Sequence, residues 1–209
     1  MFGSVDGGDT WDELTGNIGG ACAPADPACP QGGFQSIEYI EGPNSDKLVL
    51  GTEAGVFASV EPHFDCWFEL GDGLPNTLIW DFDYHAPSDL LVAGTLGRGA
   101  WTLEGVADLE VPVLTIPGGV HFQDTCVGET SISTLNVCNT GGANLQITDI
   151  TSSNSQFDVT EPSSGFPVVI SPDFCFPFQV SFTPTSPGHK TATFTVDSND
   201  PCQGGVDVS

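Results

Sequence analysis

The first half of the chain repeats itself, and this repeat constrains the fold more than any other feature. Residues 47–57 (Lys-Leu-Val-Leu-Gly-Thr-Glu-Ala-Gly-Val-Phe) match residues 90–101 (Leu-Leu-Val-Ala-Gly-Thr-Leu-Gly-Arg-Gly-Ala-Trp). The aligned glycines Gly51 and Gly94 are 43 residues apart, within the range of periods that mark repeated structural units. The sequence therefore predicts at least two copies of one small unit.

A third copy overlaps these two. Residues 2–14 and 57–70 both begin with Phe-x-Ser-Val-acid and end with Trp-x-Glu-Leu. Short strands broken by Gly, Asn, Asp and Pro fill each copy, with no helical periodicity. In residues 77–84, alternation predicts a half-buried strand, with one face formed by Leu78, Trp80, Phe82 and Tyr84.

These copies predict about two and a half blades of a β-propeller in residues 1–106. Closed propellers have roughly 4 to 8 blades. An incomplete arc exposes sheet edges, so we expect this half to need further blades upstream or a partner.

One segment near the start carries a recognisable motif. It fits S-x-D-x-G-x-T-W at every fixed position, with Ser4, Asp6, Gly8, Thr10 and Trp11. This pattern resembles the Asp-box of sialidase-like (BNR repeat) β-propellers. The resemblance implies a structural role for these residues: the Asp and the Gly shape a tight turn, and the Trp packs between blades, away from any catalytic centre.

The second half has the pattern of a β-sandwich. We expect residues 107–118 to form a linker and a first strand, and residues 119–209 to add strands, about seven in all, separated by turns. In residues 174–182 the alternation predicts an inward face, formed by Phe174, Phe176, Phe178, Val180 and Phe182.

Several short segments of this half carry a recognisable combination of residues: Val127–Glu129, Leu135–Gly141, Phe157, Ile170–Pro172, Val180–Thr185 and Ser198–Pro201. With these segments, this half resembles the Hydin-like or ASH immunoglobulin-like domains, which occur in bacterial surface proteins and in ciliary proteins. The sequence ends at Ser209, partway into the closing strand that the resemblance implies, so we expect that strand to be truncated and its sheet edge weak.

Composition narrows the possible partners and the compartment. The formal net charge is −25, from 3 Lys+Arg against 28 Asp+Glu. Nucleic-acid binding is excluded because neutralising phosphates needs clustered cations, and no apolar run is long enough to insert into a membrane. Seven cysteines without zinc spacing favour an oxidising compartment. We expect an extracellular or cell-surface protein, of bacterial origin.

The cysteines suggest a pairing scheme. Cys22 and Cys29 flank a short Pro/Ala loop, so a disulfide between them is the first expectation. In the second half we expect Cys138–Cys175 across neighbouring strands and Cys126–Cys202 as the remaining pair, although four cysteines allow three connectivities. Cys66 is the candidate for the odd thiol.

No catalytic site stands out. Sialidases bind the substrate carboxylate with an arginine cluster, and this chain has only Arg98. Among 28 acids, no spacing nominates a glycosidase pair. Tyr39 and Tyr84 occupy equivalent repeat positions, which favours a packing role over a nucleophile.

One set of residues could bind a metal. Asp81, Asp83 and His85 alternate along a predicted strand, but same-face neighbours lie about 7 Å apart. We therefore favour a solvated strand face, expect no metal or other cofactor, and leave calcium at the acidic turns as an alternative.

The function expected from these observations is a non-catalytic secreted or cell-surface structural or adhesion module, which binds protein or glycan. Two alternatives remain. The chain could be the accessory C-terminal part of an extracellular glycoside hydrolase whose catalytic blades lie upstream. It could also be a subunit of an extracellular filament or layer that assembles by strand addition.

Overall fold

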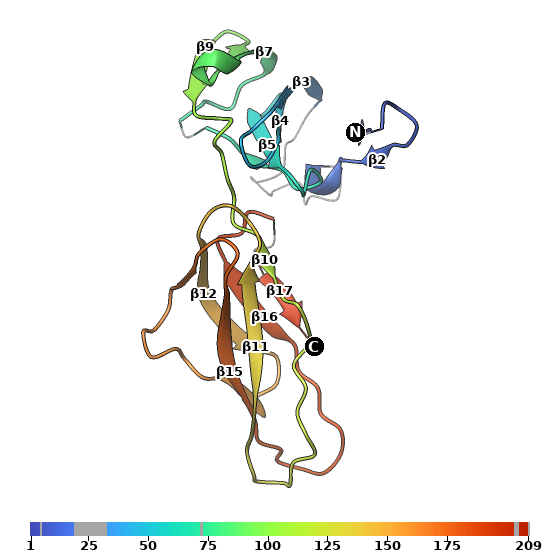
Figure 1. Ribbon diagram of the computed structural model, residues 1–209, viewed down its shortest axis with the longest axis vertical. Helices are drawn as coiled ribbons and strands as arrows, with labels where there is room; N and C mark the ends of the chain where they lie inside the picture. Colours follow the sequence, from blue (N-terminus) through green and yellow to red (C-terminus); the bar gives the residue numbers. More distant parts are fainter. Residues whose placement is uncertain (5, 19–32, 72, 203–204, 209) are drawn as a thin grey trace. The chain divides into compact units, whose positions relative to one another are not determined.

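The computed structural model describes residues 1–4, 6–18, 33–71, 73–202 and 205–208 (Figure 1). The fold is all-β, as predicted, with the short 3-10 turns η1 (Gly16–Ile18) and η2 (Ala86–Ser88). No helix in these residues is long and apolar enough to cross a membrane. The chain divides into two compact units, Met1–Glu110 and Val111–Ser209.

The division lies inside the segment 107–118 that the sequence assigned to a linker and a first strand. Lys47 explains why residues 107–110 stay with the N-terminal unit. Its side chain is fully buried, and its Nζ donates to the Ala107 carbonyl at 2.6 Å. The same Nζ lies 4.0 Å from Glu110 Oε1.

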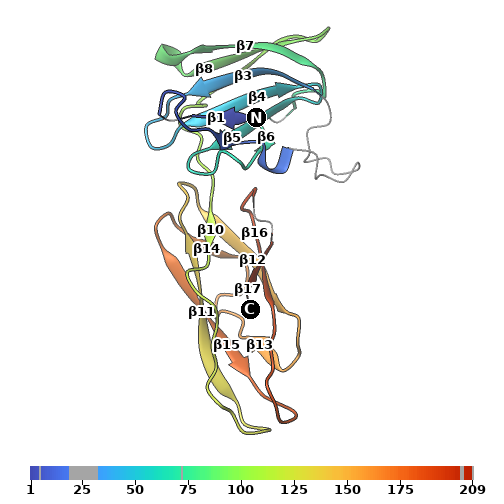
Figure 2. The same ribbon diagram turned by 90° about the vertical axis from the view of Figure 1, so that its right-hand side faces the viewer.

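The N-terminal unit contains three antiparallel sheets (Figure 2). A hairpin pairs β1 with β2, a four-stranded sheet has the order β3-β4-β5-β6, and a three-stranded sheet has the order β7-β8-β9. The strands are β1 (Phe2–Gly3), β2 (Asp12–Glu13), β3 (Phe34–Ile40), β4 (Lys47–Thr52), β5 (Val56–Val60), β6 (Phe68–Glu69), β7 (Ile79–His85), β8 (Leu90–Thr95) and β9 (Gly99–Glu104).

The sequence repeat is a structural repeat. Gly51 on β4 pairs with Val56 on β5, and the aligned Gly94 on β8 pairs with Ala100 on β9. One residue further, Leu50 pairs with Phe57 and Ala93 pairs with Trp101. The two hairpins therefore have the same register, and each strand residue of one has a counterpart in the other, although the turn of the second hairpin is one residue longer.

Two apolar clusters bury both faces of the four-stranded sheet. One cluster lies between this sheet and the three-stranded sheet and includes Val49, Ala58, Ile79 and Phe82. The other lies on the opposite face, and its buried members are Ile18, Leu50, Phe57 and Trp67, with Met1 and Leu48 packed against them. All five residues of β5 are consequently buried.

The strand predicted over residues 77–84 forms as β7, but one of its side chains does not face the predicted way. The pairing of β7 with β8 shifts between Ile79 and Asp81, which marks a bulge that reverses the facing of side chains on its two sides. Ile79 is therefore fully buried, whereas Trp80 is 66% exposed. The expectation that Trp80 shares an inward face with Phe82 and Tyr84 is wrong.

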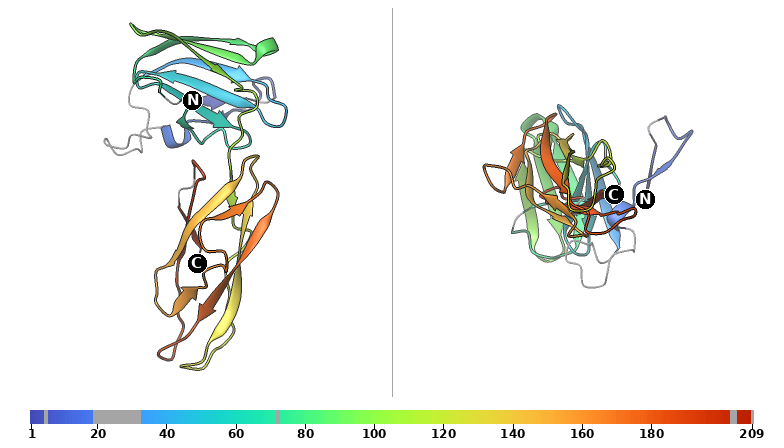
Figure 3. Two further views of the ribbon diagram at one scale, coloured as in Figure 1. Left: turned by 90° about the vertical axis from the view of Figure 1, so that its left-hand side faces the viewer. Right: turned by 90° about the horizontal axis from the view of Figure 1, so that it is seen from below.

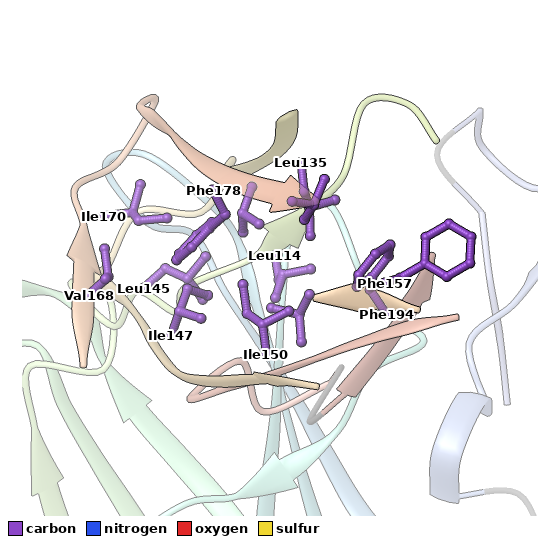
Figure 4. Packing of buried hydrophobic residues seen from close by; sticks show 13 residues of the cluster. Leu114, Leu135, Leu145, Ile147, Ile150, Phe157, Val168, Ile170, Phe178 and Phe194 are labelled. Atoms are coloured by element: carbon purple, nitrogen blue, oxygen red, sulfur yellow. The ribbon is translucent and has the colours of Figure 1, made fainter. Parts of the chain in front are cut away.

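The C-terminal unit is a sandwich of two four-stranded sheets, ordered β10-β11-β15-β13 and β14-β12-β16-β17 (Figure 3). Its core comes from the inner faces of both sheets, and the close-up shows how Leu135, Ile147 and Phe178 point inward (Figure 4). The strands are β10 (Leu114–Thr115), β11 (Ser131–Asn139), β12 (Leu145–Ser152), β13 (Phe157–Val159), β14 (Val168–Ile170), β15 (Cys175–Phe182), β16 (Phe194–Ser198) and β17 (Gly205–Val208).

One expectation for this unit needs correction. Phe174 does not join the inward face: it is 67% exposed because β15 begins only at Cys175, and Asp173 before it has a left-handed backbone (φ 64°). The last strand of the described structure, β17, pairs with β16 from Asp197 to Phe194.

The expected disulfide between Cys138 and Cys175 is present. These residues stand directly opposite each other on β11 and β15, with their Cα atoms 3.9 Å apart. Cys22 and Cys29, which were expected to pair, lie outside the described residues.

The other expected pairing, Cys126–Cys202, is wrong. Cys126 is a free, exposed thiol, whereas Cys202 and Cys66 are both disulfide-bonded, so Cys66 is not the odd thiol. Cys126 lies before the first residue of β11. Asp200 accepts hydrogen bonds from the N–H groups of Cys202 and Leu114, and Leu114 stands opposite Asn139, the last residue of β11. The two ends of β11 are roughly 26 Å apart at 3.3 Å per residue.

Candidate functional site

The five motif residues near the N-terminus hold the turn between β1 and β2. Asp6 is the centre of this turn, because it accepts hydrogen bonds from the Thr10 backbone N–H at 2.9 Å and the Thr10 hydroxyl at 2.6 Å. These bonds hold the pKa of the Asp6 carboxyl well below its usual range. The Gly8 N–H donates to Ser4 Oγ at 2.7 Å, and Ser4 Oγ donates to Asp6.

Trp11 differs from what the resemblance implies. Its indole N–H donates to the Gly8 carbonyl at 3.1 Å, but the side chain is 61% exposed. It therefore stabilises its own turn and does not pack between two sheets of the described structure.

The strand set Asp81, Asp83 and His85 does not converge. Asp81 accepts a hydrogen bond from Ser36 Oγ at 3.3 Å, whereas His85 Nδ1 bonds with Ser88 Oγ at 2.7 Å. Burial and the charges of Asp83 and Asp81 raise the pKa of Glu38 on the neighbouring strand. No group of three His, Cys, Asp or Glu residues in the described ranges is arranged to hold a metal ion.

Tyr39 and Tyr84 make equivalent hydrogen bonds in the two repeats. Tyr39 donates its hydroxyl to Asp46, and Tyr84 donates to Asp89 Oδ1 at 3.0 Å. Each pair joins the end of the first strand of its sheet, β3 or β7, to the loop that follows it. Both tyrosines therefore brace their hairpins. Only Tyr84 also packs against the apolar cluster between the sheets, since Tyr39 is 55% exposed.

The hydrogen bond to Asp46 predicts a high titration midpoint for Tyr39. It raises the pKa of Tyr39 to about 12, because ionisation removes the donor and places a second negative charge beside the Asp46 carboxylate. The stabilisation is complete below the ordinary tyrosine pKa of about 10 and is lost as the pH rises through the folded value.

We expect Asp46→Asn to lower this midpoint toward about 10. The absorbance of tyrosinate would be followed in a Tyr84→Phe background, where Tyr39 is the only tyrosine left of the two in the chain. An unchanged midpoint in the Asp46→Asn protein would show that Asp46 is not the cause.

The two larger sheets of the N-terminal unit differ at the edge that follows the repeated hairpin. In the four-stranded sheet, β5 pairs with β6 through Phe57↔Glu69 and Ala58↔Phe68. The equivalent strand of the other sheet, β9, pairs only with β8 among the described strands. Its residues are almost all exposed, so its outward N–H and C=O groups are available to another strand.

An apolar groove of about 560 Å³ lies beneath this edge. Its walls come from both sheets and from the segment after β9, and Glu69 and Glu104 also line it. Trp101, on the edge strand itself, is 40% exposed. The apolar lining includes Phe68, Leu70, Leu74, Leu91, Trp101 and Leu103. Edge and groove together form a surface that offers both backbone hydrogen bonds and apolar contact, and we call it the β9 site.

Residues 112–207 match the protein-family model described as "HYDIN/CFA65/VesB-like, Ig-like domain". The match supports a Hydin-like immunoglobulin-like fold for the C-terminal unit, which we call the Hydin-like domain. A similar solved structure is the crystal structure of a protein of unknown function from Porphyromonas gingivalis W83, with 13% identity and a TM-score of 0.36, covering 88% of this chain and 97% of that chain. A comparison with curated proteins found no match.

The Hydin-like domain has a larger cleft, of about 820 Å³, between the loops around His121 and His189. Its floor is aromatic, but the rings pack mainly on one another: the centroids of Phe157 and Phe182 are 4.4 Å apart, and those of Phe122 and Phe157 are 5.6 Å apart. These contacts identify the floor as the end of the domain core. The β9 site is the stronger candidate because its exposed backbone groups are directional.

Proposed function

We propose that this protein is a non-catalytic extracellular module, formed by the end of an Asp-box propeller and a Hydin-like domain, that associates with other protein chains. The observation that carries the proposal is the β9 site, a strand edge above an apolar groove that pairs with no other strand of the described structure. An exposed edge is a template for strand addition, and main-chain hydrogen bonds supply the affinity in that mode of recognition.

Two further properties support an extracellular setting. The Cys138–Cys175 disulfide belongs to an oxidising compartment. The net charge of −25 keeps copies of the chain apart unless salt screens the carboxylates. We therefore expect association to strengthen with ionic strength, as it would for a subunit of a surface layer or filament.

The test is to block the edge without removing its side-chain contacts. Val56 is the counterpart of Ala100 in the repeat, and its carbonyl points away from β4, where it accepts from the Leu70 N–H. The backbone groups of Ala100 therefore point away from β8, and those of Thr102, two residues further on, point the same way. Thr102→Pro removes one of these outward N–H groups and leaves the pairing with β8 intact.

Sedimentation velocity would be measured at high salt over a wide range of protein concentration. Wild type and the control Thr102→Val, which keeps the N–H, are expected to form larger species, while Thr102→Pro stays monomeric. Equal sedimentation of all three proteins at every concentration would contradict association through this edge.

A further inference from the structure

The last strands of the two earlier repeats, β2 and β6, make the same contacts with their neighbours. In the hairpin, Phe2 stands opposite Glu13, and the Leu14 N–H donates to the Met1 carbonyl at 2.9 Å. In the four-stranded sheet, β6 makes the same two contacts with β5, at Phe57↔Glu69 and from the Leu70 N–H to the Val56 carbonyl, also at 2.9 Å. Both outer strands follow a tryptophan in the pattern Trp-x-Glu-Leu.

The tryptophan of the second copy occupies a defined site. Trp67 is only 1% exposed and lies in the apolar cluster between the hairpin and the four-stranded sheet. Its indole N–H donates to the Leu14 carbonyl at 2.9 Å. The ring therefore fills the space between two successive repeats and is tied to the earlier one.

The groove of the β9 site is the next such space along the repeat. The cluster around Trp67 contains five other residues, and the repeat gives each a counterpart that lines the groove. The counterpart of Leu14, whose carbonyl accepts the indole bond, is Leu70, which also lines the groove. In pairs, the residues are Met1 and Val56, Ile18 and Leu74, Leu48 and Leu91, Leu50 and Ala93, and Phe57 and Trp101.

Only the tryptophan lacks a counterpart. No Trp-x-Glu-Leu follows β9, since the chain continues from Glu104 into Gly105-Val106-Ala107. Val106 and Leu109 supply part of one wall, yet the side chain at the Phe57 position, Trp101, is left 40% exposed, against 2% for Phe57 itself. The groove is continuous with the apolar interface between the two sheets, through Leu70.

We propose that the β9 site binds an extended strand, donated by a separate protein chain, that carries the pattern Trp-x-Glu-Leu. The strand pairs antiparallel with β9, with its Glu opposite Trp101 and the N–H of its Leu donating to the Ala100 carbonyl. Its indole fills the groove and donates to the Leu70 carbonyl. This inference rests on the proposed function and names the chemistry of the partner strand.

A peptide of the chain's own sequence provides the probe. Residues 9–16 (Asp-Thr-Trp-Asp-Glu-Leu-Thr-Gly) contain the pattern without a cysteine, and the matched control carries Trp11→Ala in the peptide. Binding to the full-length protein would be measured by fluorescence anisotropy of the labelled peptide and by hydrogen exchange of the amides in β9.

We expect the Trp peptide to bind at least about tenfold more tightly than the control, because a buried aromatic anchor dominates such contacts. It should also slow exchange at Ala100 and Thr102. Thr102→Pro in the protein should weaken binding through the edge, and Leu74→Ser should weaken it through the groove. Leu96→Ser, at a residue that is 64% exposed and outside the groove, should leave binding unchanged.

The outcomes separate this inference from the proposed function. Equal binding of the two peptides, with β9 protected, would overturn the tryptophan site and keep edge association. Self-association that depends on Thr102 but is undisturbed by either peptide would also overturn the inference, because the edge would then be held by a contact that does not use a Trp-x-Glu-Leu strand. If neither peptide binds and the protein does not associate, both proposals fall.

Discussion

Replacing Trp67 by alanine is expected to lower the free energy of unfolding of the N-terminal unit by about 4 kcal/mol, the range for removing a large aromatic side chain from a core. Its indole packs between the hairpin and the four-stranded sheet and donates to the Leu14 carbonyl. Asn17 adds to this contact, because its side chain bonds both the N–H and the C=O of Trp67 at 2.8 Å. The substitution leaves a cavity and removes the indole hydrogen bond.

Trp80→Ala is the matched control, since Trp80 is 66% exposed and surface substitutions usually change stability by less than about 0.5 kcal/mol. Denaturant unfolding would be followed by tryptophan fluorescence under non-reducing conditions. All four tryptophans of the chain lie in the N-terminal unit, so this signal reports that unit alone. Similar midpoints for the two variants would refute the role assigned to Trp67.

Asn139→Ala is expected to cost the Hydin-like domain a similar amount, about 4 kcal/mol. Asn139 is fully buried at the end of β11, and its side chain makes four hydrogen bonds. It accepts from the Val113 and Gly141 N–H groups and donates to the carbonyls of Ala143 and Ile170, at 2.7 to 3.3 Å. Each buried backbone group left without a partner costs about 1 kcal/mol or more.

The control is Asn136→Ala, on the same strand but exposed. Far-UV circular dichroism would show the loss of the domain, while tryptophan fluorescence should report an unchanged N-terminal unit. A shift below about 1 kcal/mol for Asn139→Ala would mean that water or a rearranged loop replaces the amide. A matching shift in the fluorescence transition would contradict the independence of the two effects.

The repeat and the sandwich pattern could be predicted because they depend on local order along the chain. Gly51 and Gly94 recur with their flanking strands, and period-two alternation on residues 176–182 matches the buried Phe178 and Val180. The likeness to Hydin-like domains likewise followed from short segments such as Leu135–Gly141, where Asn139 lies. These features are determined by which residues neighbour each other in sequence.

The errors occurred where distant residues decide the outcome. A bulge, which alternation cannot show, turned Trp80 outward. Cys126 and Cys202 are both near strand ends, but the strand order places them at opposite ends of β11. The groove residues of the β9 site were also missed, although the absence of a Trp-x-Glu-Leu segment after Trp101 was a signal in the sequence.

By itself, the sequence determined the all-β class, the repeated hairpins and the position of the Hydin-like domain, because propensity and periodicity act over a few residues. Only the tertiary structure decided which equivalent residues are covered. Trp11 and Trp67 stand in the same sequence pattern, yet Trp11 is 61% exposed and Trp67 is 1% exposed. The reason is physical: burial depends on whether a second sheet packs against the first, and no local pattern carries that information.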